Sequence, residues 1–347
     1  MGIWMLKMFR RIPDQARRSD RYLIPLRSTL YLSLKLAVLF IALIGCLSNT
    51  RSSVWGQASA NRQSKASFHI EVQDGQGTRI AGSELRTTPS NTDAASLDFD
   101  RVYQPGDRII FGGPQWMAIR LDASMPECPI YRSHSAPGNS SYEIPYGRAE
   151  QQTGSAYSSE SFAGQSHRVT MRALNEQELL GYRNLALNPC DLLQFDAASD
   201  QIFPHASSNS VSRSLFDFES RNAIDGNIQN GHHGVWPYES WGPQLRTDIW
   251  LKVDFGRPVE LDKVRLMVRA DFPHDSYWKS ADLEFSDGSH LTLQIGPSAE
   301  FQQFSFPKRR VSWFRVANVV PEDPNKWCSF IEVEAWGRDL IGLGPTR

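Results

Sequence analysis

The amino-acid sequence predicts an all-β protein with two β-sandwich domains that follow an N-terminal signal or anchor segment. Short apolar stretches recur between clusters of Gly, Pro, Asn and Ser, the pattern of strands separated by turns. In several of these stretches apolar and polar side chains alternate with the period of two that a half-buried strand requires. The length of 347 residues is enough for about two domains.

Residues 1–47 are first basic and then apolar, which is the order found in export signals. The apolar run Leu36–Leu47 is as long as a signal-peptide core and short for a bilayer span. It contains Leu43-Ile44-Gly45-Cys46, which resembles the lipobox of bacterial lipoproteins, where the cysteine carries a lipid. We expect export, with lipidation at Cys46, cleavage after Ala58-Ser59-Ala60, or retention as an uncleaved anchor. The protein would then be anchored in the cell envelope through this segment alone, or be secreted.

The charge of the chain is unevenly distributed. The total is 37 basic against 38 acidic side chains, but beyond residue 46 there are 29 basic and 36 acidic ones, a net charge of −7. A negative average field repels a polyanion, and no compact basic stripe offsets it. We therefore expect no nucleic-acid binding.

Residues 48–66 are small and polar, as in a flexible linker. Residues 67–183 predict a small β-sandwich, and nothing in them indicates its role. One helix is expected at 176–182, because Asn175 and Glu178 have the spacing of a capping box. The expected strands of this domain are 68–73, 107–113, 117–122, 141–147 and 167–174.

Residues 184–338 have a clearer strand pattern. Leu251, Val253 and Phe255 alternate with polar or outward positions, and 286–289 (Ser-Asp-Gly-Ser) reads as a hairpin turn. With no competing helical period, an antiparallel sandwich or jelly roll is the simplest architecture. The expected strands are 250–255, 263–268, 281–285, 290–295, 301–306, 313–319 and 330–337.

Three cysteines follow the export segment: Cys128, Cys190 and Cys328. An exported chain can form disulfides, and an odd count leaves at least one thiol over. One disulfide and three buried thiols both remain open. The cysteines are not arranged as zinc ligands.

Seven of the ten tryptophans lie in the second domain. Those within expected strands (Trp250, Trp313 and Trp336) are interpreted as packing residues. The others lie in polar connections, where no core needs to be filled, and we expect them to face water. They are Trp236, Trp241, Trp278 and Trp327.

Several motifs of the second domain occur in the order typical of one family. They are Asn-Leu-Ala-Leu-Asn-Pro (184–189), Pro-His-Ala-Ser-Ser-Asn-Ser (204–210), Asn-Ala-Ile-Asp-Gly-Asn (222–227), the segment 250–266 and Phe-Ile-Glu-Val-Glu-Ala-Trp-Gly (330–337). Residues 184–338 thus resemble the coagulation factor V/VIII type C, or discoidin-like, domains of the galactose-binding-like β-sandwiches. The resemblance implies a discoidin-like jelly roll and a structural calcium ion beside the Asp-Gly-Asn turn. The oxygen ligands that this implies are Asp225, Asn227, Asn230 and Glu332.

Many members of this family bind sugars through loops at one end of the sandwich. Residues 269–278 (Arg-Ala-Asp-Phe-Pro-His-Asp-Ser-Tyr-Trp) have suitable chemistry, because a sugar needs a flat aromatic ring for its C–H face and polar groups for its hydroxyls. The segment 232–241 has a similar composition. The expected ligand contacts are Arg269, Asp271, His274, Tyr277, Trp278, Trp236 and Trp241. An alternative is structural: ion pairs Arg269–Asp271 and His274–Asp275 lock the loop while Phe272 and Trp278 plug the sandwich end.

The sequence does not predict an enzyme. It has no nucleophile elbow, phosphate-binding glycine loop, His-Glu-x-x-His motif or dinucleotide fingerprint. Two small sandwiches also leave little room for the cleft that glycoside hydrolysis needs. We expect a non-catalytic, carbohydrate-binding protein of the envelope. The alternatives are a scaffold or adhesion module that binds a protein or lipid surface, and an accessory part of a polysaccharide-degrading system.

Overall fold

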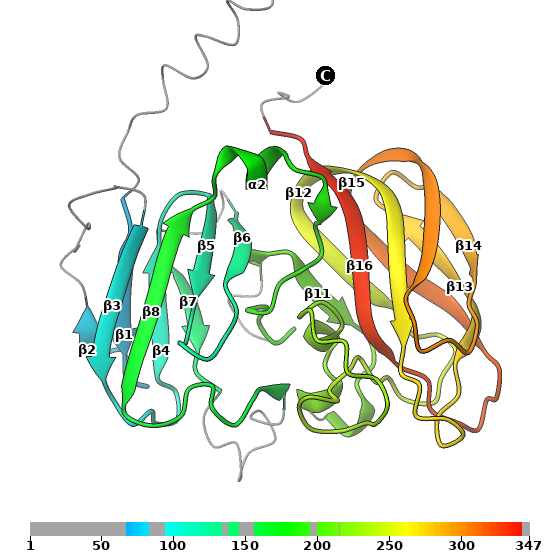
Figure 1. Cartoon of the computed structure of the whole chain (residues 1–347), viewed down its shortest axis with the longest axis horizontal. Coiled ribbons are helices and arrows are strands. Elements are labelled where there is room, and N and C mark those ends of the chain that lie inside the picture. The colour runs from blue at the N-terminus through cyan, green and yellow to red at the C-terminus, as the bar shows by residue number, and fades with distance from the viewer. Residues whose placement is uncertain are drawn as a thin grey trace, which may run out of the picture. The chain divides into compact units, whose positions relative to one another are not determined.

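The structure is a computed structural model that describes residues 67–341, apart from 83–93, 134–137, 146–155, 195–199 and 215. Residues 65–347 form one compact unit. The described chain is nearly all β, in antiparallel sheets, which confirms the predicted all-β sandwich fold (Figure 1). The described part of the chain contains no helix long and apolar enough to span a bilayer. The export segment, Cys46 and the linker 48–66 lie outside the described residues.

Two sheets pack face to face in the first half of the described chain. They share a core to which the four-stranded sheet contributes Ile70 and Phe111 and the five-stranded sheet Ile119 and Val169. The four-stranded sheet has the order β2 (Arg79–Gly82), β1 (His69–Gln73), β4 (Arg108–Gly112) and β7 (Ser140–Glu143). The five-stranded sheet has the order β10 (Ile202–Phe203), β6 (Cys128–Arg132), β5 (Trp116–Arg120), β8 (Ser166–Ala173) and β3 (Ala94–Asp100).

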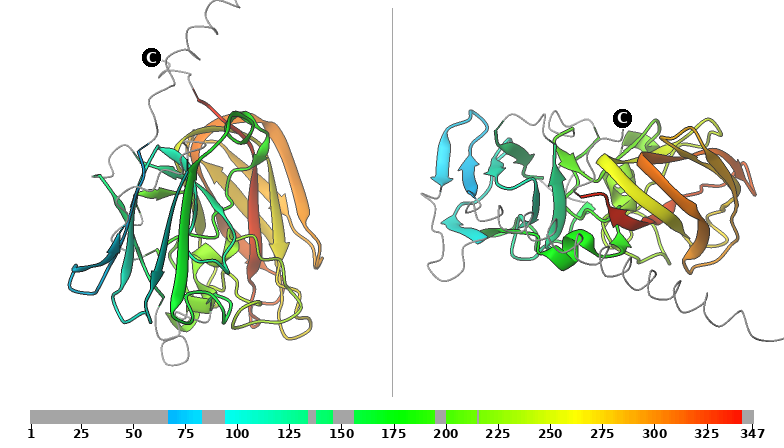
Figure 2. Two further views of the ribbon diagram at one scale, coloured as in Figure 1. Left: turned by 60° about the vertical axis from the view of Figure 1, so that its left-hand side comes forward. Right: turned by 90° about the horizontal axis from the view of Figure 1, so that it is seen from above.

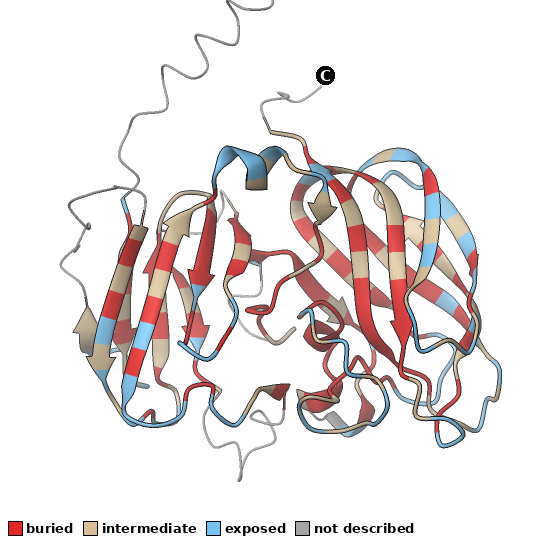
Figure 3. Cartoon of the chain, in the orientation of Figure 1, coloured by how far each residue is buried: buried red, intermediate tan, exposed pale blue. Residues whose placement is uncertain are grey.

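The second half is a seven-stranded antiparallel sheet around its own core. Its order is β14 (His290–Gln294), β13 (Trp278–Phe285), β15 (Gln302–Pro321), β12 (Leu251–Val268), β16 (Phe330–Asp339) and β9 (Arg183–Asn184), and β11 (His205–Ser208) pairs with β12. Buried and exposed positions alternate along these strands, as the sequence pattern predicts (Figure 3). Between β11 and β12 the described residues form the short 3-10 turns η2 (Ser212–Ser214), η3 (Phe216–Phe218) and η4 (Ser220–Ala223).

Two pairs of expected strands are each one long strand. Residues 251–255 and 263–268 belong to β12, and 302–306 and 313–319 belong to β15; the two strands run side by side in yellow and orange (Figure 2). Gly256 does not end β12, because its φ of 63° lets the strand pass through a bulge between Asp254 and Val259. A side chain at Gly256 would overlap the ring of Phe203 in β10. Before the bulge β12 pairs with β11, and after it with β16.

The short helix and the hairpin are confirmed. Helix α2 (Glu176–Leu180) begins with the expected capping box: the Asn175 side chain accepts from the Glu178 backbone N–H, and the Glu178 carboxylate accepts from the Asn175 N–H. At the hairpin, the Phe285 N–H donates to the Ser289 carbonyl at 2.9 Å. Both are local signals, so the sequence alone specifies them.

Covalent and polar links connect the two sheet systems. Cys128 in β6 is disulfide-bonded to Cys190, 62 residues later, while Cys328 remains a buried free thiol. The buried Arg257 guanidinium lies 4.4 Å from the centre of the Trp116 ring, and its Nε donates to Asp339 Oδ1 at 2.8 Å. These links fix where loops from both halves meet.

Loss of the disulfide should destabilise the protein measurably. Replacing Cys128 and Cys190 together by Ser is expected to lower the free energy of unfolding by about 4 kcal/mol, because the bond closes a loop of 62 residues in the unfolded chain. Urea denaturation of the oxidised protein measures this value, and adding reductant to the wild type should reproduce it. A reductant that leaves the wild-type midpoint unchanged would contradict the assignment.

Stability should also depend on pH through His205. Burial lowers the pKa of His205, but the charge and the 2.7 Å hydrogen bond of buried Asp191 raise it by more, so the pKa lies above its ordinary value. The charged form therefore stabilises the fold below about pH 6.5, and this contribution is lost as pH rises through the raised pKa. Measured by urea denaturation, the free energy of unfolding should fall more steeply with rising pH in the wild type than in His205→Gln. An equal dependence on pH in the two proteins would refute the raised pKa of His205.

Candidate functional site

Two loops of the second half, residues 225–241 and 269–278, lie together and form the candidate site. The Ala270 N–H donates to the Asn230 carbonyl at 2.9 Å, which joins the two loops. The Arg269 N–H donates to the Ser329 carbonyl and the Ser276 N–H to the Trp327 carbonyl, which joins the second loop to the segment before β16. Backbone bonds of this kind place the side chains of both loops with little freedom.

An ion pair buried beneath these loops holds them. Arg269, 3% exposed, makes two parallel hydrogen bonds with the carboxylate of Asp275, and its Nη1 lies 3.4 Å from the hydroxyl of Ser240. The expectation that Arg269 contacts a ligand is therefore corrected, because the fold already surrounds and pairs its guanidinium. The alternative expectation of a locked loop holds in part: Asp275 replaces Asp271 as the partner of Arg269, and Trp278 is buried, but Phe272 is 38% exposed and does not plug the sandwich end.

Two of the expected aromatic platforms are inside the protein. Trp241 is fully buried and Trp278 is 2% exposed, and their ring centres lie 5.5 Å apart. Trp278 also packs at 4.6 Å against Phe330, and the Trp241 indole N–H donates to the Ser210 carbonyl. Neither ring can stack on a ligand. Tyr277 is half-buried against the same core, with its ring 6.3 Å from that of Phe272.

The tryptophans within or beside strands have the opposite arrangement to the one expected. Trp250, Trp313 and Trp336 are half-buried on outward positions. A cation covers each ring: Lys252 lies 5.4 Å from the Trp313 ring centre, and Lys263 lies 4.6 Å from that of Trp336. Arg315 lies 5.8 Å from the ring of Trp250. The core therefore takes its indoles from the loops.

One expected aromatic contact remains at the surface. Trp236 is 43% exposed and lines a pocket between the candidate site and the loops of the first half. The pocket is lined by apolar and polar groups together, a composition that suits small ligands. Its other polar lining residues include Ser124, Tyr157, Ser161, Arg221, Asp225, Asn227 and Glu239.

Three carboxylates gather behind this pocket. Glu332, 1% exposed, accepts from the Gly226 N–H at 3.1 Å, and Glu239, 2% exposed, accepts from the Asn227 side chain at 2.8 Å. Gly226 has a φ of 84°, which lets the Asp225-Gly226 turn approach Glu332. The second carboxylate oxygen of Glu239 has no hydrogen-bond partner among the described residues. Asp225, Glu239 and Glu332 thus lie in one region, and their hydrogen bonds do not satisfy every carboxylate oxygen.

Burial and the charge of Asp225 raise the proton affinity of the other two acids. Burial, together with the charge of Asp225, raises the pKa of Glu239 to about 8 and that of Glu332 well above its ordinary value. Burial likewise raises the pKa of Asp225 to about 6, although the Arg221 guanidinium opposes this. Arg221 donates to carbonyl and amide oxygens of Pro189, Asp191 and Asn222, so its hydrogen bonds go elsewhere. A bound cation would remove the repulsion.

Oxygen donors of the kind that calcium prefers lie in this region, and they differ in part from the expected ligand set. Asp225, Asn227 and Glu332 lie in one region as expected, and Glu239 joins them through Asn227. Asn230 has other partners: its amide donates to the Ala299 carbonyl, and its own carbonyl accepts from Ala270. No sequence pattern pointed to Glu239, because it lies in the segment 232–241, whose composition resembles that of the expected sugar-binding loop 269–278. Oxygen-rich sets of this kind suit hard dications.

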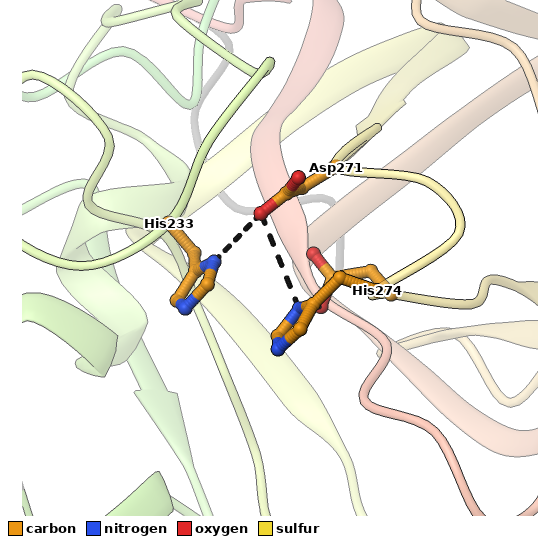
Figure 4. Close-up of side chains that lie close together, drawn as sticks. His233, Asp271 and His274 are labelled. Carbon is orange, nitrogen blue, oxygen red and sulfur yellow. Dashed lines mark hydrogen bonds and ion pairs between the residues drawn. The ribbon is translucent and has the colours of Figure 1, made fainter.

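Histidines and a carboxylate meet at the surface of the same loops. The Nδ1 of His233 lies 2.8 Å from Asp271 Oδ2, and the Nδ1 of His274 lies 4.0 Å from the same oxygen (Figure 4). The hydrogen bond from His233 lowers the pKa of Asp271. The side chains of His274 and Asp271 are 55% and 24% exposed, and His233 joins them from the other loop.

No protein-family model and no curated protein matches the chain, so the resemblance to factor V/VIII type C domains stays a prediction. Among solved structures, chitosan-binding module 1 of a Paenibacillus sp. IK-5 chitosanase/glucanase is 21% identical, over 45% of this chain and 99% of that chain, with a TM-score of 0.32. A fucose-binding module of Streptococcus pneumoniae is 17% identical, over 45% and 99%, with a TM-score of 0.33. The lectin domain of lectinolysin, in complex with Lewis B antigen, is 17% identical, over 45% and 97%, with a TM-score of 0.34. These neighbours are carbohydrate-binding modules or lectin domains by name.

If calcium occupies the carboxylate cluster, chelation should lower the thermal midpoint of the wild type by several degrees, since a lost kilocalorie shifts it by about 2 to 4 °C in a chain of this size. Calorimetry with excess calcium and then with chelator measures the difference. Glu239→Gln removes a carboxylate that the ion would need as a ligand, so it should reduce the calcium effect. A wild-type midpoint that is the same in both conditions would remove calcium from this site.

Proposed function

We propose that the protein is exported, tethered to the membrane by its N-terminal segment, and binds a glycan without catalysis. The observation that carries this proposal is Trp236, an exposed indole at the edge of a pocket with amide, carboxylate and hydroxyl groups. An indole in that position is not needed to fill a core, since Trp241 and Trp278 already do so.

The chemistry of the pocket suits a sugar. A pyranose ring has C–H patches on its faces, which pack on an aromatic ring, and hydroxyls at its edge, which need donors and acceptors. Trp236 supplies the aromatic surface, and Asn227 and Glu239 supply polar groups within the same pocket. Both are held in place by the hydrogen bond that joins their side chains. The sugar would therefore meet a preorganised wall, which reduces the entropy lost on binding.

The proposed calcium ion has a structural part in this function. By neutralising Asp225, Glu239 and Glu332 it would fix the turn at 225–227 and the chain that follows it to Trp236. The ion supplies charge compensation, and the protein's own side chains make the contacts with the glycan. Asp271 and His274 extend the polar surface on the neighbouring loop.

A second candidate function is binding to a lipid or protein surface. It is favoured by exposed apolar side chains on the same two loops: Ile228, Val235, Trp236 and Phe272. A membrane or a protein partner would cover this apolar edge. The two functions differ in which side chains they need, because a sugar has no use for Val235, while an apolar surface buries it together with Trp236.

Substitution of Trp236 separates these functions. Trp236→Ala is expected to weaken glycan binding about tenfold, the equivalent of about 1.4 kcal/mol of stacking. Val235→Ala, its exposed neighbour, is the matched control and should bind as the wild type does. A glycan array identifies the ligand, and affinity electrophoresis on the corresponding polysaccharide measures the loss.

The opposite pattern would overturn the proposal. If no glycan retards the wild type, and both variants lose binding to anionic lipid vesicles or to a protein partner, the apolar surface is the functional one. Binding of a glycan that is equal in wild type and Trp236→Ala would place the sugar elsewhere on the molecule.

A further inference from the structure

We infer that His233, Asp271 and His274 form a binding site for a transition-metal ion, with Zn²⁺ as the best match. This site is separate from the carboxylate cluster proposed for calcium, and it does not depend on glycan binding. It lies at the surface where the loop 225–241 meets the loop 269–278 (Figure 4).

The geometry brings several metal-binding atoms together. One ligand atom from each of His233, Asp271, His274 and Asp275 lies within 4.8 Å of the other three. The imidazole rings of His233 and His274 are 4.6 Å apart and nearly parallel, with an angle of 4° between their planes. Their Nδ1 atoms both point toward Asp271 Oδ2. An ion beside that oxygen would need only small side-chain rotations to reach both nitrogens.

The types of donor atom in this site indicate which metal ion it would bind. Imidazole nitrogen suits zinc, copper, iron and nickel, whereas calcium and magnesium prefer oxygen alone. Two histidines and one carboxylate are also a known three-ligand set for zinc, which leaves the fourth position to water or to an external group. We assign His233, Asp271 and His274 as the protein ligands.

Asp275 has a supporting role in this site. Its carboxylate is already bound by both prongs of the buried Arg269 guanidinium, and its Oδ1 lies 3.1 Å from the Nδ1 of His274. The backbone N–H of Asp275 donates to the Asp271 carbonyl at 2.8 Å. Asp275 therefore shapes the turn that carries Asp271, and the His274 Nδ1 would exchange its contact with Asp275 for the ion.

His232 lies next to the site but is not needed to complete it. Its Nδ1 is 3.5 Å from Asp271 Oδ2 and its side chain is mostly exposed. Its ring meets that of His233 nearly edge-on, at 74°. Adjacent histidines such as His232 and His233 rarely bind one ion together, because neighbouring side chains of an extended segment point apart. The pair that the fold brings together, His233 and His274, is 41 residues apart and has no signal in the sequence.

Titration of the full chain with zinc tests the inference. The protein is purified without a histidine tag, kept in excess calcium so that the carboxylate cluster is saturated, and titrated with ZnCl₂ in a calorimeter. One ion should bind, and His233→Ala and His274→Ala should each weaken binding by about 100-fold or more, since each removes a ligand. His290→Ala, which removes an exposed histidine on β14, is the matched control and should bind as the wild type does.

The absorption spectrum of bound Co²⁺ reports on the ligands of the metal ion. Co²⁺ at this site should produce the visible absorption of a four-coordinate ion with nitrogen ligands, and this band should be absent in both histidine variants. His274 is largely exposed, so His274→Ala should keep the wild-type thermal midpoint without metal even if His233→Ala does not fold. Zinc affinity that is unchanged in His274→Ala, or Co²⁺ without such a band, would overturn the inference. Both readouts are independent of any glycan, so failure here leaves the carbohydrate proposal unaffected.

Discussion

The ion pair between Arg269 and Asp275 is the constraint on which both candidate surfaces depend. It is buried, so removing either partner alone would leave an uncompensated charge in the interior, at a cost of about 3 to 5 kcal/mol. Arg269 immediately follows β12 and Asp275 lies shortly before β13, so the pair closes the connection between two strands of the sheet. This closure sets the direction of the whole connection, and with it the position of Asp271 and His274.

The candidate site therefore has two layers with different structural roles. The inner layer contains Arg269, Asp275, Trp241 and Trp278, and its groups satisfy one another. The outer layer contains Trp236, the histidines and Asp271, which remain in contact with water. Large rings packed against Phe330 make the inner layer rigid, so the outer groups can be held at fixed positions although they belong to loops. Rigid support of this kind is what a binding surface on loops requires.

The fold could be predicted further than the site. Alternation gave the strands of the second half, and local caps and turns gave α2 and the hairpin, because these signals depend on neighbours in the sequence. The position of a loop tryptophan depends on distant contacts instead: Trp241 forms a bridge with Phe330, 89 residues later. Polar neighbours in the sequence therefore led to a wrong prediction of exposure for Trp241 and Trp278, but to a right one for Trp236. Glu239, the disulfide pairing and the contact of His233 with His274 could not be predicted for the same reason, because they too depend on contacts between distant parts of the sequence.

Gly256 shows how closely the two sheet systems are fitted. Its Cα faces the ring of Phe203, and an added methyl group would come within 2.3 Å of that ring. Phe203 lies in β10, the edge strand of the five-stranded sheet, and pairs there with Tyr131 of β6. Exchange of one hydrogen for the smallest side chain would thus push on both halves at once. Gly256, which has no charge, ligand or side chain, is consequently among the least replaceable residues of the protein. A search for critical positions that considered only reactive groups would miss it.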